Sequence, residues 1–116
     1  MTGPGPGGLT NPQAINHLIS ATDGATMTAR FRGANPRSVR GWLFDRSAFD
    51  SLLGQASCAG IRIYRGLKDD GTENLVIVGT DATGNDLVSA MGSGLVAEIG
   101  WPCPPMCGTT SILGAT

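Results

Sequence analysis

Two apolar segments separated by an acidic turn constrain the fold of this chain more than any other feature. Residues 60–66 alternate in polarity, and residues 75–79 form a continuous run rich in β-branched side chains. The segment between them contains Asp70-Gly71, a pair typical of hairpin turns. The sequence therefore predicts an antiparallel hairpin with strands at about 60–66 and 74–80. Because the second strand is apolar on both faces, we expect it to be central and covered by helices.

A long helix is predicted before the hairpin, over about residues 12–31. Asn11 is a favourable N-cap, and Pro12 suits the first helical position. Apolar side chains and threonines then recur at helical spacing from Ile15 to Thr26, which is typical of one face of a helix.

A second helix is predicted over about residues 46–53. Asp45 is a plausible N-cap, and Gly54 follows the last apolar position. A short strand at 38–44 is expected between the two helices. The predicted fold class is therefore α+β, a small antiparallel sheet centred on the hairpin with both helices packed on it.

The 18 glycines and seven prolines lie mainly near the two ends of the chain and in residues 92–108. We therefore expect a Gly/Pro-rich arm over 1–10, an α+β domain over 11–100 and a non-helical Pro/Cys-rich tail over 101–116. Residues 87–99 are apolar but contain two glycines, and the pattern leaves a helix and an irregular structure equally open.

The opening residues contain neither a basic segment nor an apolar one, so no secretory signal is expected. No apolar run is long enough to predict a membrane span. The expected compartment is the cytoplasm, and export without a classical signal stays open. Eight basic and nine acidic residues give a net charge of −1, which argues against nucleic acid as a partner. The charged fraction of only 15% favours a surface covered by another protein or by copies of the same chain.

The segment Cys103-Pro-Pro-Met-Cys107 is the most distinctive motif of the sequence. Its two thiols could be reduced, could form a disulfide, or could bind a metal together with Cys58 and His17. Reduced thiols in a rigid turn are the favoured interpretation, because the expected cytoplasmic location disfavours disulfides and the spacing is not that of common zinc sites. The prolines also exclude the helix that thioredoxin-like redox motifs require.

His17, the sole histidine, could take part in general acid–base catalysis. The sequence contains no recognisable motif for a nucleophile that it would activate. The favoured interpretation of His17 is a partly exposed helix residue. The carboxylates Asp69, Asp70 and Glu73 fit the hairpin turn. The Asp81-x-x-x-Asn85-Asp86 segment could hold calcium if another loop added oxygens, although it does not match an EF-hand.

Arginines dominate the basic residues and suit both phosphate and protein interfaces. Arg62 and Tyr64 share one face of the first hairpin strand, and Arg65 points to the other. A separate basic stretch over 30–46 is opposed only by Asp45 and could bind phosphate or an acidic partner surface. Its members are Arg30, Arg32, Arg37, Arg40 and Arg46.

The second half of the chain resembles a group of small uncharacterised bacterial proteins. The motifs that carry the resemblance are G-I-R-I-Y at 60–64, L-V-I-V-G-T-D-A at 75–82, G-N-D-L at 84–87 and P-C-P-P-M-C at 102–107. The group has no assigned activity, so the resemblance implies no catalytic role. It does indicate which positions to examine for a functional role: Arg62, Tyr64, Asp81, Asn85, Asp86, Cys103 and Cys107.

These observations favour a non-enzymatic structural or interaction module that self-assembles, or docks on a larger assembly, through its terminal arms. The candidate interaction residues are Arg62, Tyr64, Asp81, Asn85, Asp86 and Trp101. The alternative is a small thiol- or metal-binding protein that uses Cys103 and Cys107 with Cys58. An enzyme built around Arg62, Tyr64 and Asp86 is the least favoured class. No cofactor is expected, with zinc and calcium as the alternatives considered.

Overall fold

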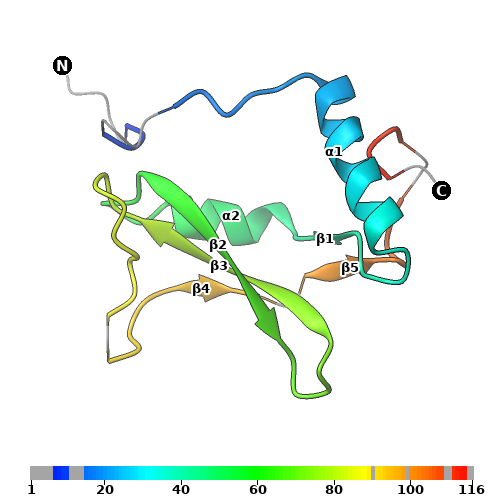
Figure 1. The fold of residues 1–116 in the computed structure, drawn as a ribbon. Coiled ribbons are helices and arrows are strands. Elements are labelled where there is room, and N and C mark those ends of the chain that lie inside the picture. The colour runs from blue at the N-terminus through cyan, green and yellow to red at the C-terminus, as the bar shows by residue number, and fades with distance from the viewer. Residues whose placement is uncertain (1–6, 11–14, 90, 99, 109–110, 115–116) are drawn as a thin grey trace. The chain divides into compact units, whose positions relative to one another are not determined.

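The computed structural model describes residues 7–10, 15–89, 91–98, 100–108 and 111–114. Contacts within the chain define two units, of which unit 1 comprises residues 1–15 and 44–99 and unit 2 comprises residues 16–43 and 100–116. Figure 1 shows the elements in chain order: α1 (Ala21–Ala34), β1 (Gly41–Leu43), α2 (Arg46–Leu53), β2 (Gly60–Leu67), β3 (Glu73–Thr80), β4 (Val96–Ala97) and β5 (Trp101–Cys103). Two helices and two small antiparallel sheets confirm the predicted α+β class.

The predicted hairpin is confirmed in unit 1. Strands β2 and β3 pair antiparallel in a continuous register that runs from Gly60↔Thr80 to Leu67↔Glu73. At the turn, the carboxylate of Asp70 accepts hydrogen bonds from the backbone N–H and the hydroxyl of Thr72, at 3.0 and 2.7 Å. Gly71 follows with a positive φ of 85°, a conformation that glycine adopts without steric cost.

Strand β3 is the central strand of the three-stranded sheet, because β4 pairs with its other edge in the order β2-β3-β4. Ile77 faces Ala97 and Val78 faces Val96 in this second pairing. The described part of the segment 87–99 is therefore not helical: it consists of an isolated bridge, turns and the short strand β4.

The core of unit 1 lies between β3 and α2. Its most buried apolar residues among those described are Leu52, Cys58, Ile77 and Val78. Helix α2 matches its predicted range, and Asp45 caps it by accepting a 3.0 Å hydrogen bond from the N–H of Ser47. The loop after α2 approaches β3 closely, since a Cβ at Gly79 would lie 2.8 Å from the sulfur of Cys58. Within unit 1, helix α2 and the loop after it pack against the central strand.

Helix α1 in unit 2 begins later than predicted. Residues 15–20 have no regular structure, and Ser20 is the N-cap, with its hydroxyl accepting a 3.0 Å hydrogen bond from the N–H of Asp23. The predicted helix is therefore wrong over residues 15–20, while the part over 21–31 is confirmed. The proposed cap and first turn at 11–14 lie outside the described residues.

Unit 2 also contains a two-stranded sheet that joins the middle of the chain to its end. Strand β1 is shorter than the predicted 38–44, and it pairs with β5 so that Trp42 faces Pro102. The N–H of Arg40 donates to the carbonyl of Cys103 at 2.6 Å and extends this pairing. No helix in the described part of the chain is long and apolar enough to cross a membrane.

The core of unit 1 can be tested with two neighbouring leucines of α2, because Leu52 is 2% exposed and Leu53 is 50% exposed. Leu52→Ala leaves a cavity against β3 and is expected to lower the free energy of unfolding by about 2–5 kcal/mol. Leu53→Ala is the matched control, with an expected loss below about 1 kcal/mol. Urea unfolding followed by far-UV circular dichroism measures both, and equal losses would contradict this assignment of the core.

Candidate functional site

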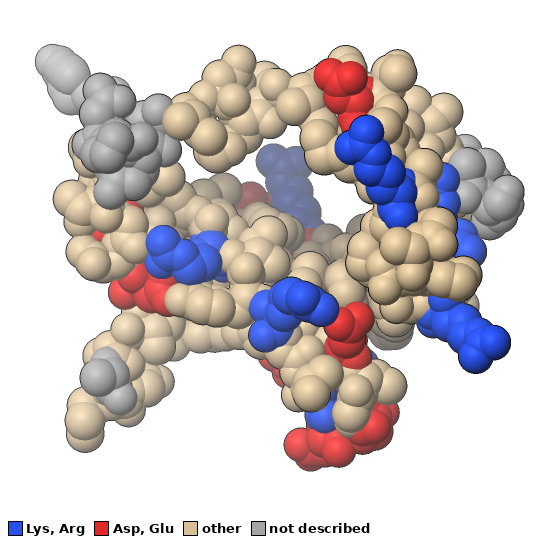
Figure 2. Space-filling view, in the orientation of Figure 1, with Lys and Arg blue, Asp and Glu red and all other residues tan. Residues whose placement is uncertain are grey.

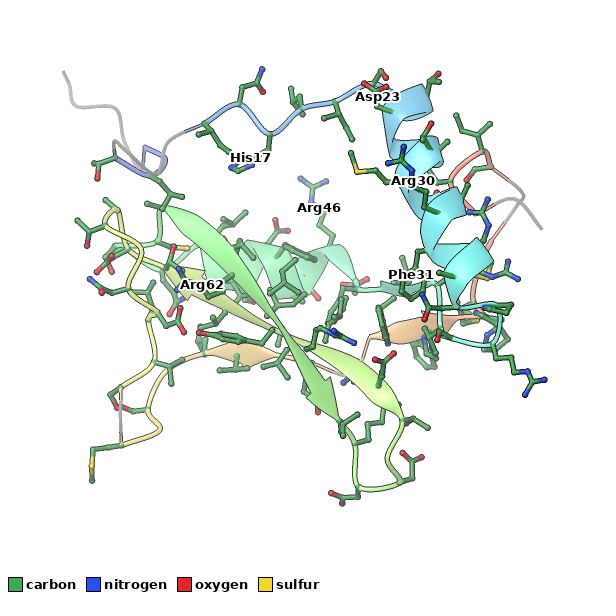
Figure 3. The ribbon with its side chains drawn as sticks, viewed as in Figure 1. His17, Asp23, Arg30, Phe31, Arg46 and Arg62 are labelled. Atoms are coloured by element: carbon green, nitrogen blue, oxygen red, sulfur yellow. A yellow bond between two sulfur atoms is a disulfide. The ribbon has the colours of Figure 1, made fainter. Side chains whose placement is uncertain are left out.

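The polar residues Arg62, Tyr64 and Asp86, here called the Asp86 cluster, meet on one face of the sheet of unit 1. Arg62 and Tyr64 lie two positions apart on β2, so their side chains share a face. The two oxygens of the Asp86 carboxylate accept separate hydrogen bonds, one from the guanidinium of Arg62 and one from the hydroxyl of Tyr64. The same Arg62 nitrogen donates to the carbonyl of Gly84 at 2.9 Å. Figure 3 shows Arg62 projecting from β2 beside the loop that follows β3.

The loop that carries Asp86 is held by a second aspartate. Asp81 accepts hydrogen bonds of 2.9 to 3.2 Å from both the backbone and the side chain of Thr83 and of Asn85. The loop then returns to the sheet, where Asp86 forms a bridge with Thr80. Asp81 and Asn85 therefore position Asp86, so the structure brings five of the six predicted interaction residues into one region.

Charge and hydrogen bonding shift the ionisation of all three groups in the Asp86 cluster. The hydroxyl of Tyr64 and the guanidinium of Arg62 stabilise the carboxylate form and lower the pKa of Asp86 from its ordinary 3.8. The hydrogen bond to Asp86 stabilises the neutral phenol and raises the pKa of Tyr64 above its ordinary 10.0. The same carboxylate raises the pKa of Arg62. At neutral pH the cluster is therefore a charged carboxylate held between a cation and a neutral hydroxyl.

This arrangement is better suited to binding than to proton transfer. A carboxylate with a lowered pKa and two donors is a weak general base at neutral pH. The ring of Tyr64, by contrast, is 46% exposed, and 43% of the Arg62 side chain is accessible. Tyrosine and arginine are the residue types that most often dominate the energy of protein interfaces. The Asp86 cluster thus orders a loop and presents an aromatic ring and a guanidinium to solvent.

Trp101 and His17 belong to unit 2, whereas the Asp86 cluster belongs to unit 1. Trp101 is the first residue of β5 in unit 2, where it faces Leu43 and is 59% exposed. His17 is exposed as expected, but it lies in the irregular segment before α1 and not within a helix (Figure 3).

The cysteines differ from the favoured expectation of reduced thiols. Cys103 and Cys107 form a disulfide at the end of β5. Cys58 is a buried free cysteine of unit 1, and its thiol donates to the carbonyl of Gly60 at 3.3 Å. The pair and the single thiol therefore belong to separate units.

Zinc and calcium were considered only as alternatives to the expected absence of a cofactor, and that expectation is not tested. The described residues contain no group of three or more His, Cys, Asp or Glu side chains arranged to hold an ion. At the segment considered for calcium, Oδ1 of Asp81 accepts three hydrogen bonds from Thr83 and Asn85, and Oδ2 accepts one from Asn85. A cation at Oδ1 would compete with these donors.

A pocket in unit 2 was not predicted from the sequence. It has a volume of about 230 Å³ and is lined by Met27, Thr28, Phe31, Arg32, Arg40 and Leu113. Arg32 connects its walls by donating to the carbonyl of Leu113 at 2.7 Å and to the hydroxyl of Thr28 at 3.4 Å. The spacing of Met27 and Phe31, one helical turn apart, was the available signal for the apolar wall. The contribution of Leu113 comes from 82 residues beyond Phe31 and has no local signature.

The basic stretch 30–46 is divided between the units. Arg46 belongs to α2 of unit 1, where it forms a 3.4 Å ion pair with Asp50. Its other arginines belong to unit 2, on α1 and the segment before β1, and Arg32 and Arg40 line the pocket.

Comparisons with protein-family models, with curated proteins and with solved structures found no match for this chain. The resemblance to a group of bacterial proteins therefore stays a prediction, and the function has to be inferred from the geometry of the site itself.

Tyr64 is the only tyrosine of the chain, so phenolate absorbance reports the Asp86 cluster directly. In the folded protein we expect its titration midpoint to lie above the ordinary pKa of 10.0. Asp86→Asn removes the charged acceptor and should return the midpoint toward 10.0. Asp69→Asn is the charge-matched control, because the Asp69 side chain has no hydrogen-bond partner among the described residues, and it should leave the midpoint unchanged.

The pKa shifts of Tyr64 and Asp86 also determine in which direction the free energy of unfolding changes with pH. The Tyr64 contribution is complete below pH 10.0 and is lost as the pH rises through the raised pKa. The Asp86 contribution is complete above pH 3.8 and is lost as the pH falls through the lowered pKa. If Asp86→Asn left the Tyr64 midpoint where it is in the parent chain, the geometry of the cluster would be contradicted.

Thiol counting tests the disulfide. The native, unreduced chain should react slowly with a thiol reagent, because its free cysteine, Cys58, is 4% exposed. Unfolding without reductant should expose one reactive thiol, and unfolding with reductant should expose all three. Cys58→Ala is the control and should remove the signal of the unreduced, unfolded chain. Three reactive thiols without reductant would contradict the Cys103–Cys107 bridge.

Proposed function

We propose that this chain is a non-enzymatic interaction module that associates with copies of itself or docks on a larger protein assembly. The observation that carries the proposal is the large amount of apolar surface exposed within each unit. Examples are Leu67 and Met91 in unit 1, at 74% and 93%, and Leu18 in unit 2, at 88%. Exposed apolar surface of this extent is typical of proteins that bury it against a partner.

Helix α1 supports the same conclusion. None of its 14 residues is buried, although Met27 and Phe31 are large and apolar. Secondary-structure elements of globular proteins are stabilised mainly by burying an apolar face, and short helices are only marginally stable alone. A partner that covers this face of α1 would supply the burial that α1 lacks within the chain.

The described parts of both terminal segments contact residues of their own unit. The described end of the N-terminal arm is bound to its own unit, since the N–H of Thr10 donates to the carbonyl of Ala82 at 2.9 Å. Near the C-terminus, Leu113 packs against α1 at Gly24, where an added Cβ would lie 3.3 Å from its side chain. These contacts support a model in which the ends shape the docking surfaces. Residues 1–6 of the arm lie outside the described residues.

A thiol protein is the second candidate, and the Cys103–Cys107 disulfide is the observation that favours it. Cys107 and the prolines before it are exposed, so a reducing dithiol has access to the bridge. The expected location in the cytoplasm opposes this candidate, because disulfides rarely persist there. The thiol count described above is also its first test.

Light scattering across the micromolar range tests the interaction module. We expect the mass to rise with concentration from 11.9 kDa to at least twice that value, because apolar burial between chains stabilises the complex. Leu18→Ser and Met91→Ser should lower the association, since each removes a highly exposed apolar side chain. Thr116→Ser, a conservative change at the last position, is the control. A mass of 11.9 kDa at every concentration, in the absence of a partner protein, would oppose self-association.

A further inference from the structure

The two units carry opposite charge, which the near-neutral whole conceals. Unit 2 has four arginines and one aspartate, a formal charge of +3, whereas unit 1 has four basic and eight acidic residues, a formal charge of −4. The net charge of the chain is only −1, so two copies repel each other weakly. Opposite patches on one molecule can then attract their counterparts on another.

The pocket of unit 2 joins this positive charge to an apolar surface. Met27, Phe31 and Leu113 supply apolar atoms, Arg32 and Arg40 supply guanidinium groups, and no carboxylate of the described residues lines it. The side chain of Arg40 is exposed and has no hydrogen-bond or ion-pair partner among the described residues. At about 230 Å³ the pocket is smaller than the roughly 300–1,000 Å³ of sites for drug-sized ligands. It suits one apolar side chain with a carboxylate close by.

The β2–β3 turn of unit 1 has this chemistry. Leu67, at the end of β2, is 74% exposed. Two residues further on, the side chain of Asp69 has no hydrogen-bond partner among the described residues, whereas Asp70 is engaged by Thr72. Figure 2 shows acidic side chains gathered where Figure 1 places this turn, and basic side chains over α1 and the loop after it. The turn therefore presents an apolar side chain and a free carboxylate together.

We propose that the pocket of unit 2 receives the β2–β3 turn of a second copy of this chain, with Leu67 against Met27 and Phe31 and with Asp69 opposite Arg40. Apolar burial supplies most of the stability, and the charges fix the orientation and accelerate the encounter. The two contacting surfaces differ, so the interface is heterologous and repeats from copy to copy. The inference rests on the proposed self-association and names its surfaces.

Two double variants each remove one side of the interface. The turn variant, Leu67→Ser with Asp69→Lys, and the pocket variant, Met27→Ser with Arg40→Glu, change exposed side chains that have no hydrogen bond in the described structure. Each variant alone should need at least about tenfold higher concentration to associate than the parent chain. Far-UV circular dichroism verifies that both remain folded. Arg37→Glu, an exposed arginine of unit 2 outside the pocket, is the charge-matched control and should change association less than Arg40→Glu alone.

Mixing the two variants is the decisive measurement. The turn variant keeps its pocket and the pocket variant keeps its turn, so an equimolar mixture has one intact pair of surfaces. We expect complexes of twice the 11.9 kDa mass and no larger ones. The second contact would keep only a reversed charge pair, because Leu67→Ser and Met27→Ser remove the apolar burial that supplies most of its stability. About 1 M salt, which shortens the Debye length to about 3 Å, should weaken the mixed complex.

The possible failures are distinguishable. If the parent chain associates and the turn variant associates equally well, the proposed surfaces are wrong while self-association stands. A mixture that stays at the mass of single chains, at concentrations where the parent chain associates, also overturns the proposed surfaces. If the parent chain itself remains at 11.9 kDa throughout, self-association and this interface fail together.

Discussion

The contact of α2 with the central strand β3 is the interaction on which unit 1 depends. Leu52 and Ile77 are the two largest fully buried side chains among the described residues, and they come from these two elements. The same strand pairs along one edge with β2 and, at Ile77 and Val78, with β4 on the other, so the backbone is paired on both sides where these two side chains are buried. The Asp86 cluster is attached to this strand by two routes, because β2 pairs with β3 and the loop that carries Asp86 follows β3.

The parts of the fold predicted correctly are those whose signals are local. The hairpin follows from adjacent strand patterns joined by Asp70-Gly71, and α2 follows from the cap at Asp45. The prediction for α1 is wrong over residues 15–20, because it rests on Asn11-Pro12 alone. Ser20-x-x-Asp23 is itself a recognised pattern at the start of a helix, and Ser20 is the N-cap in the structure. The pairing of β1 with β5 joins residues about sixty positions apart, for which one sequence has no local signal.

The candidate site, like the fold, was predictable only where the signal is local in the sequence. The alternation of β2 places Arg62 and Tyr64 on one face, but only the structure shows that Asp86 is their common acceptor. A sequence signal for the loop existed. Asp70 and Asp81 are each followed two positions later by a threonine that donates from its backbone and its hydroxyl. The hydrogen bonds from Thr72 lower the pKa of Asp70, and those from Asn85 and then Thr83 lower the pKa of Asp81. Both turns fix their loops. The pattern can be found in a sequence, whereas the pocket at Leu113 cannot.

The net charge of the whole chain does not describe the charge that each unit carries. A balance of eight basic and nine acidic residues indicates a neutral molecule, but the fold sorts them into a basic unit and an acidic one. The sorting follows the sequence, because every charged side chain of unit 2 lies within residues 16–43, whereas the segment 100–116 joins this unit without a charged side chain. That segment contributes β5, the disulfide and Leu113 to the basic unit without adding a carboxylate side chain. In the proposed interface, the excess of arginines beside the apolar pocket would favour an acidic contact surface. The specificity of that interface would then come from the uneven distribution of charge between the units, and not from the net charge of the chain.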